Sequence, residues 1–256
     1  MTKMIITTVQ WNIGGGLIRD KNSDKAVDQS YDTDGLKYIV NKLREINSDI
    51  ITFQEIHEGD FSQTKEVSEA LEMSYFVINP YDNSHLNKQA RLSQSIISKY
   101  PLSNHKYQMF TNPGFKVTIN GKQYPCHDKG ITSVDAKING DILRLETLHL
   151  IPFGRTEIDP LSKKAFQYRE DISSKIATDS KRFLLQGDFN FDNDSLKAFI
   201  PMVFSEGTKE ILQKLPTRAT GKRYDHVVYR GMELVETRVW EDALTDHYPI
   251  VSTFLV

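Results

Sequence analysis

The segment Leu185-Gln186-Gly187-Asp188-Phe189-Asn190 combines residue types that can act on a phosphate ester or a metal ion. An apolar run ends in a glycine, and a carboxylate and a carboxamide follow two positions apart. In an extended segment the side chains of residues i and i+2 leave the same face, so Asp188 and Asn190 can converge on one metal ion or phosphoryl group. Asp192-Asn193-Asp194 follows directly, and Asp and Asn also favour turns and caps, so a strand-to-helix turn is the alternative interpretation.

Other strand-like runs also carry acid, amide or imidazole groups at or near one end. They are 5–12 with Gln10-Trp11-Asn12, 50–55 with Gln54-Glu55, 145–150 with His149, 224–229 with Asp225, and 244–250 with Asp246-His247. Strands chosen at random do not all finish in this way, so the pattern favours a shared site over a set of unrelated turns.

Phosphoester cleavage needs a cation to neutralise the phosphoryl oxygens, a base to activate water, and stabilisation of the leaving oxyanion. Glu55 offers the hard oxygen ligand that Mg²⁺ or Mn²⁺ takes from proteins. An ionised Asp is a weak base, with an ordinary pKa near ~3.9, so Asp188 is interpreted as a group that positions water with the help of the metal. The sequence lacks the His-rich or Cys-rich cluster that is typical of structural zinc.

In their order along the chain, these segments resemble the endonuclease/exonuclease/phosphatase superfamily. This metal-dependent group includes deoxyribonucleases, abasic-site endonuclease, tyrosyl-DNA phosphodiesterase, neutral sphingomyelinase and inositol-polyphosphate 5-phosphatase. Trp11-Asn12 resembles its first motif, Gln54-Glu55 its metal-binding Gln-Glu, residues 187–190 its Gly-Asp-x-Asn, and Thr245-Asp246-His247 its C-terminal Ser-Asp-His with Thr for Ser. The resemblance covers essentially the whole chain. It implies an α/β fold, a four-layer sandwich of two packed mixed β-sheets flanked by helices.

The resemblance implies a metal region made by three residues. Glu55 would be the principal ligand of Mg²⁺ or Mn²⁺. Asn12 would assist at the metal and phosphate, and Asp246 would reach the metal directly or through water.

The resemblance also implies the catalytic residues. Asp188 and Asn190 would activate water and orient the phosphate. His247 would donate a hydrogen bond or a proton to a phosphoryl oxygen, and Asp225 would orient its imidazole. His149 resembles the second histidine of the deoxyribonuclease and sphingomyelinase branches, which helps the leaving group or the phosphate.

Four basic residues are candidates for substrate binding, although a solvated charge is the ordinary role of each. Arg91 and Lys129 precede strand-like runs. Lys222 and Arg223 belong to the densest basic group of the chain, with Lys214 and Arg218, directly before Asp225.

Two further histidines are left outside the predicted site. Strand alternation directs His226 to the face opposite Asp225, so we expect a structural role for it. His57 follows Glu55 by two positions, where the family pattern is variable, so it is left out of the site. The single cysteine, Cys126, is expected to be an ordinary half-buried residue.

The formal net charge is −2, so any recognition of a polyanion must be local. One cysteine cannot form an intramolecular disulfide, which favours a reducing, cytoplasmic location. We expect no signal peptide, and no run approaches the ~18 apolar residues of a membrane span. With no linker, charge block or repeat to divide it, residues 1–256 are predicted to form a single catalytic domain.

Periodicity predicts a β-α-β beginning, a strand-rich middle and a second alternating region. The expected helices are 36–46 with Asp34 as a candidate N-cap, 62–72, 161–178 and one near 194–200. The expected strands are 4–11, 49–54, 74–79, 93–98, 115–119, 131–138, 142–149, 182–186, 224–229, 232–239 and 248–255. Residues 13–33 form a long polar connection that begins with Gly14-Gly15-Gly16, a candidate specificity loop.

The leading hypothesis is a Mg²⁺-dependent phosphodiesterase or nuclease, with nucleic acid or a nucleotide-linked phosphodiester as its partner. A sphingomyelinase-like or inositol-phosphate phosphoesterase is the rival, for which residues 107–110 and 113–115 are the only apolar hints. A non-catalytic binding module on the same scaffold is the alternative of another class, and it would be expected to lack some of the site residues. No stable membrane anchor is expected, and no protein partner can be inferred.

Overall fold

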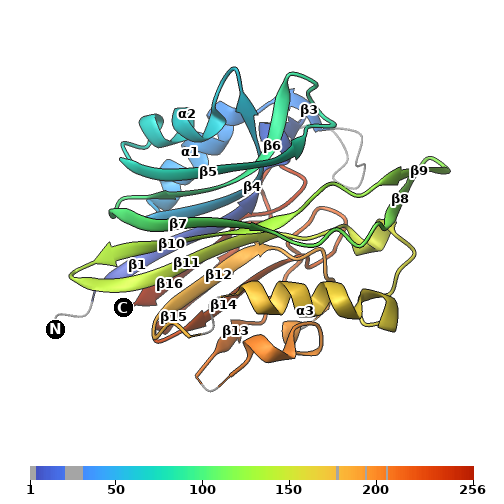
Figure 1. The fold of residues 1–256 in the computed structure, drawn as a ribbon. Coiled ribbons are helices and arrows are strands. Elements are labelled where there is room, and N and C mark those ends of the chain that lie inside the picture. The colour runs from blue at the N-terminus through green and yellow to red at the C-terminus, as the bar shows by residue number, and fades with distance from the viewer. Residues whose placement is uncertain (1–3, 21–30, 177–178, 194, 206) are drawn as a thin grey trace.

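The computed structural model describes residues 4–20, 31–176, 179–193, 195–205 and 207–256. Two six-stranded mixed sheets pack face to face, and helices cover their outer surfaces (Figure 1). The predicted four-layer α/β arrangement is therefore confirmed.

The first sheet has β1 and β4 at its centre, and this pair is parallel whereas its other pairs are antiparallel. In spatial order its strands are β15 (Glu233–Val239), β16 (Ile250–Leu255), β1 (Ile5–Asn12), β4 (Ile50–Gly59), β6 (Ala90–Ser98) and β5 (Tyr75–Asn83).

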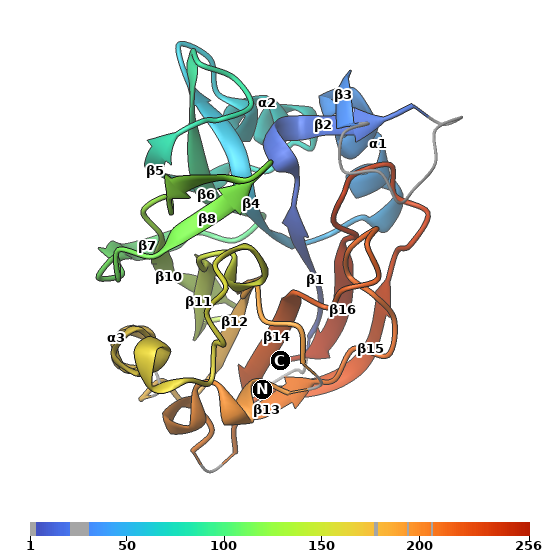
Figure 2. The same ribbon diagram turned by 90° about the vertical axis from the view of Figure 1, so that its right-hand side faces the viewer.

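The second sheet is built in the same way around the parallel pair β11 and β12. In spatial order its strands are β13 (Lys209–Ile211), β14 (Asp225–Arg230), β12 (Phe183–Asp188), β11 (Asp141–His149), β10 (Gly130–Ile138) and β7 (Leu102–Met109). The chain ends labelled in Figure 1 lie at the end of the sandwich where β1 begins, and Figure 2 looks onto the opposite end.

Helices α1 and α2 lie over the first sheet, and α3 lies over the second (Figure 1). They are α1 (Leu36–Ile46), α2 (Gln63–Ala70) and α3 (Phe166–Lys175), with the short 3₁₀ turns η1 (Gly14–Gly16), η2 (Phe153–Arg155), η3 (Lys163–Ala165), η4 (Leu196–Ala198) and η5 (Pro201–Val203). Two hairpins complete the fold, β2 (Leu17–Arg19) with β3 (Tyr31–Asp34) and β8 (Lys116–Ile119) with β9 (Lys122–Pro125). None of the helices in the described residues is long and apolar enough to cross a membrane.

Strand alternation places the polar residues of β12 between the two sheets. Phe183 and Leu185 pack in the cluster under α3, whereas Leu184 belongs to the cluster that includes both sheets. Gln186 and Asp188 follow Leu184 at two-residue steps and therefore face the first sheet. The interlayer is thus apolar at one end and becomes polar where β12 ends.

Three of the four expected helices were correct in position, and two of these three, α2 and α3, are shorter than expected. Asp34 accepts a hydrogen bond from Leu36 N at 3.1 Å, but the N-cap residue of α1 is Gly35. The helix expected over 161–178 begins as the turn η3 and becomes α-helical only from Phe166 to Lys175. The helix expected near 194–200 is wrong, because two 3₁₀ turns stand there and Pro201 cannot continue an α-helix.

The strand predictions missed both edge strands of the second sheet, β13 and β7. β7 is an edge strand with mostly polar, exposed side chains, so it lacks the apolar run by which a strand is recognised. The connection 13–33 contains η1, β2 and β3, while its residues 21–30 lie outside the described residues. Its role as a specificity loop stays a prediction. Cys126 is more buried than the half-buried position expected, and its thiol is free.

Candidate functional site

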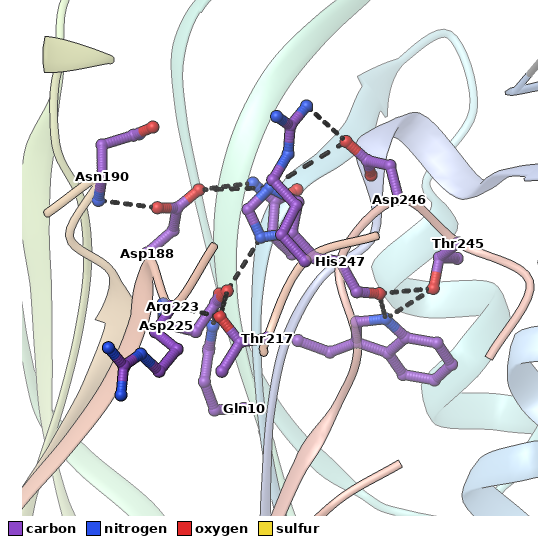
Figure 3. A network of polar contacts seen from close by, with 12 residues as sticks. Gln10, Asp188, Asn190, Thr217, Arg223, Asp225, Thr245, Asp246 and His247 are labelled. Carbon is purple, nitrogen blue, oxygen red and sulfur yellow. Dashed lines mark hydrogen bonds and ion pairs between the residues drawn. The ribbon is translucent and has the colours of Figure 1, made fainter. Parts of the chain in front are cut away.

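Asp188 lies at the centre of a buried polar cluster at the end of β12 (Figure 3). Its Oδ2 accepts a hydrogen bond from Asn12 Nδ2 at 2.9 Å, and its Oδ1 accepts one from the backbone N–H of Asn190 at 2.8 Å. The second bond is the Asx-type turn that the alternative interpretation expected. Asp188 therefore shapes the turn and also presents a carboxylate to β1 of the facing sheet.

His247 and Asp225 form a buried pair beside Asp188. His247 Nδ1 lies 2.8 Å from Asp225 Oδ2, and His247 Nε2 lies 3.8 Å from Asp188 Oδ2. Asp225 begins β14, and the end of β12 pairs with this position, which places the two acids side by side. The imidazole is thus held at one nitrogen and directed at Asp188 with the other (Figure 3).

The carboxylates around His247 set its charge. Burial lowers the pKa of an imidazole, but the negative charges, Asp225 first, outweigh burial and raise the pKa of His247 to about 10. Burial raises the pKa of Asp188 to about 6, against the opposing effect of His247. A carboxyl with a raised pKa is a better proton acceptor than a solvated Asp, so Asp188 is a stronger base than its residue type suggests.

Glu55 is held in a strained backbone conformation. The register between β4 and β6 shifts between Phe53 and Ile56, where a bulge adds one residue, and Glu55 has φ +54°. A non-glycine residue rarely adopts this conformation, and such strain concentrates at functional sites. The bulge turns the Glu55 carboxylate toward the second sheet, where Oε1 lies 3.6 Å from His149 Nε2.

His149 is buried at the end of β11 between several charged groups. Its Nε2 also lies 3.5 Å from Asp188 Oδ2, so Glu55 and Asp188 approach the same imidazole nitrogen. Lys129 Nζ lies 3.1 Å and 3.2 Å from the two ring nitrogens, and the hydroxyl of Tyr81 lies 3.1 Å from Nδ1. Burial, reinforced by Lys129, lowers the pKa of His149 well below its usual value.

Lys129 is a buried lysine, which is rare for this residue type. Burial lowers its pKa, and Glu55 and Asp188 oppose that effect. The ammonium also lies 5.0 Å from the centre of the Tyr81 ring, a cation–π contact. The structure therefore brings Lys129 to the cluster, where its charge faces the carboxylates.

The donor set fits a hard divalent cation near Glu55. Burial opposes ionisation of Glu55, but His149 and Lys129 outweigh it and lower its pKa to about 2. Among the described residues, no donor makes a hydrogen bond to this carboxylate, whose side chain is 20% exposed. An ionised and uncapped oxygen pair facing Asp188 is the arrangement that Mg²⁺ or Mn²⁺ uses. Ligand atoms of Asp188, Asp225 and His247 also lie within 4.8 Å of one another, although Asp225 and His247 are engaged with each other.

The remaining predicted site residues lie around this centre. Asn190, at φ +48°, donates from Nδ2 to the carbonyl oxygen of Leu150 at 3.0 Å. Asp246 is partly exposed and lies 3.9 Å from His247 Nε2, with Arg218 NH2 3.4 Å from its carboxylate. Asp246 is therefore adjacent to the centre and already has a cationic partner.

Three of the basic candidates are placed less centrally. Arg91 is exposed on β6, opposite Glu58 in the register. Lys222 pairs with Asp192 at 2.7 Å, and Arg223 donates its backbone N–H to the same carboxylate at 3.0 Å. Their roles in substrate binding stay predictions.

The two histidines left outside the predicted site are both buried and structural in their contacts. His226 lies on the opposite face of β14 from Asp225, where it contacts Glu210 at 3.1 Å and the carbonyl of Phe191 at 2.9 Å. His57 contacts Ser84 Oγ at 2.8 Å. Its ring lies so close to Gly15 that a Cβ there would come within 2.4 Å of it, so Gly15 is needed for packing.

Sequence reasoning missed Gln10, which supports the His247–Asp225 pair from the facing sheet. Gln10 Nε2 donates to Asp225 Oδ1 at 2.7 Å, and Thr217 Oγ1 donates to Asp225 Oδ2 at 2.8 Å. Thr52 donates to Gln10 Oε1 at 3.3 Å, which fixes the amide orientation. Gln10 precedes Asn12 by two positions, so alternation along β1 was the signal that could have found it.

Comparison of the sequence with known proteins gives a family match and a partial relative. The model of the Endonuclease/Exonuclease/phosphatase family matches residues 9–247. A UPF0294 protein of Yersinia pseudotuberculosis is 25% identical over 134 residues, which cover 51% of this chain and 45% of that protein. The match thus spans about half the length of each.

Solved structures with the same fold have low sequence identity. An endonuclease/exonuclease/phosphatase from Beutenbergia cavernae has a TM-score of 0.75 and 13% identity, covering 98% of this chain and 72% of that chain. ANGEL2, described as a 2′,3′-cyclic phosphatase in complex with adenosine-2′,3′-vanadate, has a TM-score of 0.65 and 13% identity, covering 99% and 96%. At such identities the likeness shows the fold.

Proposed function

We propose that this chain, which belongs to the Endonuclease/Exonuclease/phosphatase family, is a divalent-metal-dependent phosphodiesterase that hydrolyses nucleic acid or nucleotide-linked phosphodiester bonds. One observation carries the proposal. Glu55, Asp188 and the His247–Asp225 pair come from three strands of two sheets and from the segment before β16, and they converge on one buried position. A turn or a cap requires only local contacts, so this convergence favours a catalytic site.

The proposed roles follow from the contacts of each side chain. Asp188 orients the attacking water and accepts its proton. His247 is protonated and donates from Nε2 to a phosphoryl or leaving oxygen, while Asp225 holds Nδ1 and fixes the ring. Asn190 and Lys129 stabilise phosphoryl oxygens, since a buried ammonium acts strongly on charge that develops in a site of low dielectric.

Mg²⁺ or Mn²⁺ would be held by Glu55, with Asp188, Asn12 and Asp246 directly or through water, and would supply charge neutralisation at the phosphoryl group. The proposal covers both Mg²⁺ and Mn²⁺. So are the cytoplasmic location and the single catalytic domain over residues 1–256.

A nucleotide substrate is supported by one structural relative. ANGEL2, which shares the fold, is described with an adenosine-2′,3′-vanadate ligand. For the sphingomyelinase-like rival, the apolar hint Phe110 is only 3% exposed, whereas its neighbour Met109 is 46% exposed. The non-catalytic alternative is disfavoured because none of the proposed catalytic and metal-binding residues is missing, namely Asn12, Glu55, Asp188, Asn190, Asp225, Asp246 and His247.

The metal requirement can be tested through Glu55. Chelation should abolish hydrolysis, and Mg²⁺ or Mn²⁺ should restore it. Glu55→Gln keeps the shape and removes the charge, so it should raise the metal concentration needed for half-maximal rate, by at least about 10-fold. The measurement is the initial rate against free metal concentration. Full turnover in a metal-stripped sample would disprove the metal-dependent mechanism. An unchanged metal dependence in Glu55→Gln would show that Glu55 is not the metal ligand.

Gln10 provides a test of the positioning of Asp225. Gln10→Met keeps the volume and removes the donor, so kcat should fall roughly 10-fold while KM changes little. The control is Asn79→Leu, which removes another buried amide, bonded to Thr132 at 2.9 Å. It should lower the melting temperature without lowering kcat. If the two variants lose the same fraction of kcat, Gln10 has no particular role at the site.

A further inference from the structure

A second binding cleft lies beside Asn190. It is a cleft of about 640 Å³, a size that is typical of small-molecule sites. Its walls come from the segment after β11, from the turn after β12, and from the residues before β14. These segments adjoin the strand ends that carry His149, Asp188 and Asp225, so the cleft lies next to the proposed phosphoryl site and shares Asn190 with it. A larger cavity, of about 750 Å³, lies around Met4 and Val256, where β1 begins and β16 ends.

Tyr224 supplies an aromatic wall that is fixed in place. Its carbonyl oxygen accepts a hydrogen bond from Phe189 N at 2.8 Å, which ties it to the turn that carries Asn190. Its side chain is half-buried, and burial raises the pKa of its hydroxyl. A Cβ on Gly154 would lie 2.9 Å from that hydroxyl oxygen, so the missing side chain of Gly154 leaves room for the ring.

The apolar part of the lining is buried and rigid. Phe153 and Phe191 both pack against Phe199, with ring centres 5.8 Å and 4.7 Å apart. Ile158 and Pro160 extend the apolar wall. A flat apolar group that enters the cleft therefore meets surfaces that are already formed, which reduces the entropy lost on binding.

The charges of the cleft disfavour a second phosphate. Arg155 and Lys222 line it together with three acids, Glu157, Asp159 and Asp192. Asp192 already holds Lys222 Nζ at 2.7 Å. The lining is thus close to neutral with a slight excess of acid, and it offers both donors and acceptors at its rim. An uncharged, planar group with a polar edge fits this chemistry better than an anion.

We propose that this cleft binds a nucleobase carried by one substituent of the phosphodiester, with the base against the Tyr224 ring. The inference rests on the proposed function, because it takes the phosphoryl group to lie beside Asn190. It adds the place at which the base of such a substrate is bound, which the catalytic residues alone do not define. The phosphodiester linkage supplies the reacting atoms, and the base supplies binding energy in the cleft.

Binding of two ligands that differ only in the base tests the proposal without turnover. AMP and ribose 5-phosphate carry the same sugar phosphate, and calorimetry in the presence of Mg²⁺ gives their dissociation constants. The intact chain should bind AMP roughly 10-fold more tightly, which is within the range of base–aromatic stacking. Gly154→Val fills the cleft and should abolish the preference while binding of ribose 5-phosphate is unchanged. Tyr224→Phe keeps the ring and should retain the preference, whereas Tyr224→Ala should lose it.

The outcomes separate this inference from the proposed function. Equal binding of AMP and ribose 5-phosphate, or a preference that survives Gly154→Val, would overturn the base subsite. Tighter binding of phosphocholine than of AMP would assign the cleft to a cationic headgroup and overturn it too. A chain that binds AMP in the expected way but hydrolyses no phosphodiester would keep the subsite and reject the proposed function. Hydrolysis of a phosphodiester without any preference for the base would keep the proposed function and reject the base subsite.

Discussion

His247→Ala should lower kcat by roughly 10²–10⁴-fold, and adding Asp225→Ala should lower it little further. The reason is the 2.8 Å contact between His247 Nδ1 and Asp225 Oδ2, which makes the two residues one unit. Asp225 orients the ring and favours its charged form, so it contributes nothing once the ring is removed. The measurement is a double-mutant cycle on kcat with the two single variants and the double variant.

A matched control lies on the other face of the same strand. His226 and Glu210 are also a buried histidine–carboxylate pair, 3.1 Å apart. A cycle with His226→Ala and Glu210→Ala should show coupling in the melting temperature but no loss of kcat comparable to that of His247→Ala. Rate losses that multiply independently for His247 and Asp225 would disprove their coupling, even if each residue matters.

Asp188→Asn should give a folded protein with a turnover at least about 10²-fold lower. Asn keeps the size of the side chain, can accept the hydrogen bond from Asn190 N, and suits a turn. Both Asp188 oxygens accept hydrogen bonds, from Asn12 and from Asn190, so one contact must rearrange. Losing one such bond costs about 1 kcal/mol, which lowers the melting temperature by a few degrees. Circular dichroism during heating and the initial rate measure the two effects.

If Asp188→Asn keeps near-full activity, the segment 185–190 is only a turn and the catalytic role of Asp188 is wrong. Loss of activity together with loss of the folded signal would leave the turn interpretation standing. Asp192→Asn serves as the control, because Asp192 lies in the same turn but pairs with Lys222. It should affect kcat much less.

The strands that carry the site were predictable, because alternation and apolar runs report directly on burial. The arrangement in two packed sheets was implied by the family resemblance. His226 is an example, because its position next to Asp225 was enough to predict that the two side chains lie on opposite faces of the strand. β7 was not predictable because its edge position leaves its side chains exposed and polar. The prediction of a helix near 194–200 was wrong because Pro201 prevents an α-helix from continuing there.

Details of the site depended on contacts between residues distant in sequence. The bulge at Glu55 adds one residue to β4, and nothing in the local pattern marks that shift. The contact of Lys129 with His149 joins β11 to the residue just before β10. Gln10 reaches Asp225 across the sheets over 215 positions of sequence. Such contacts depend on how the two sheets pack, and the residue pattern along a single sequence does not show which distant residues touch.

The most direct test of the central claim is the initial rate of hydrolysis of a panel of phosphoesters by the intact chain at fixed Mg²⁺, with Asp188→Asn measured in parallel. The panel contains single- and double-stranded DNA, RNA, 5′-tyrosyl DNA, sphingomyelin and inositol phosphates. We predict hydrolysis of at least one nucleic-acid or nucleotide-linked diester, abolished by chelation and lowered at least about 10²-fold by Asp188→Asn. Hydrolysis of sphingomyelin or inositol phosphates alone, or no hydrolysis of any substrate by the metal-loaded chain, would contradict the account.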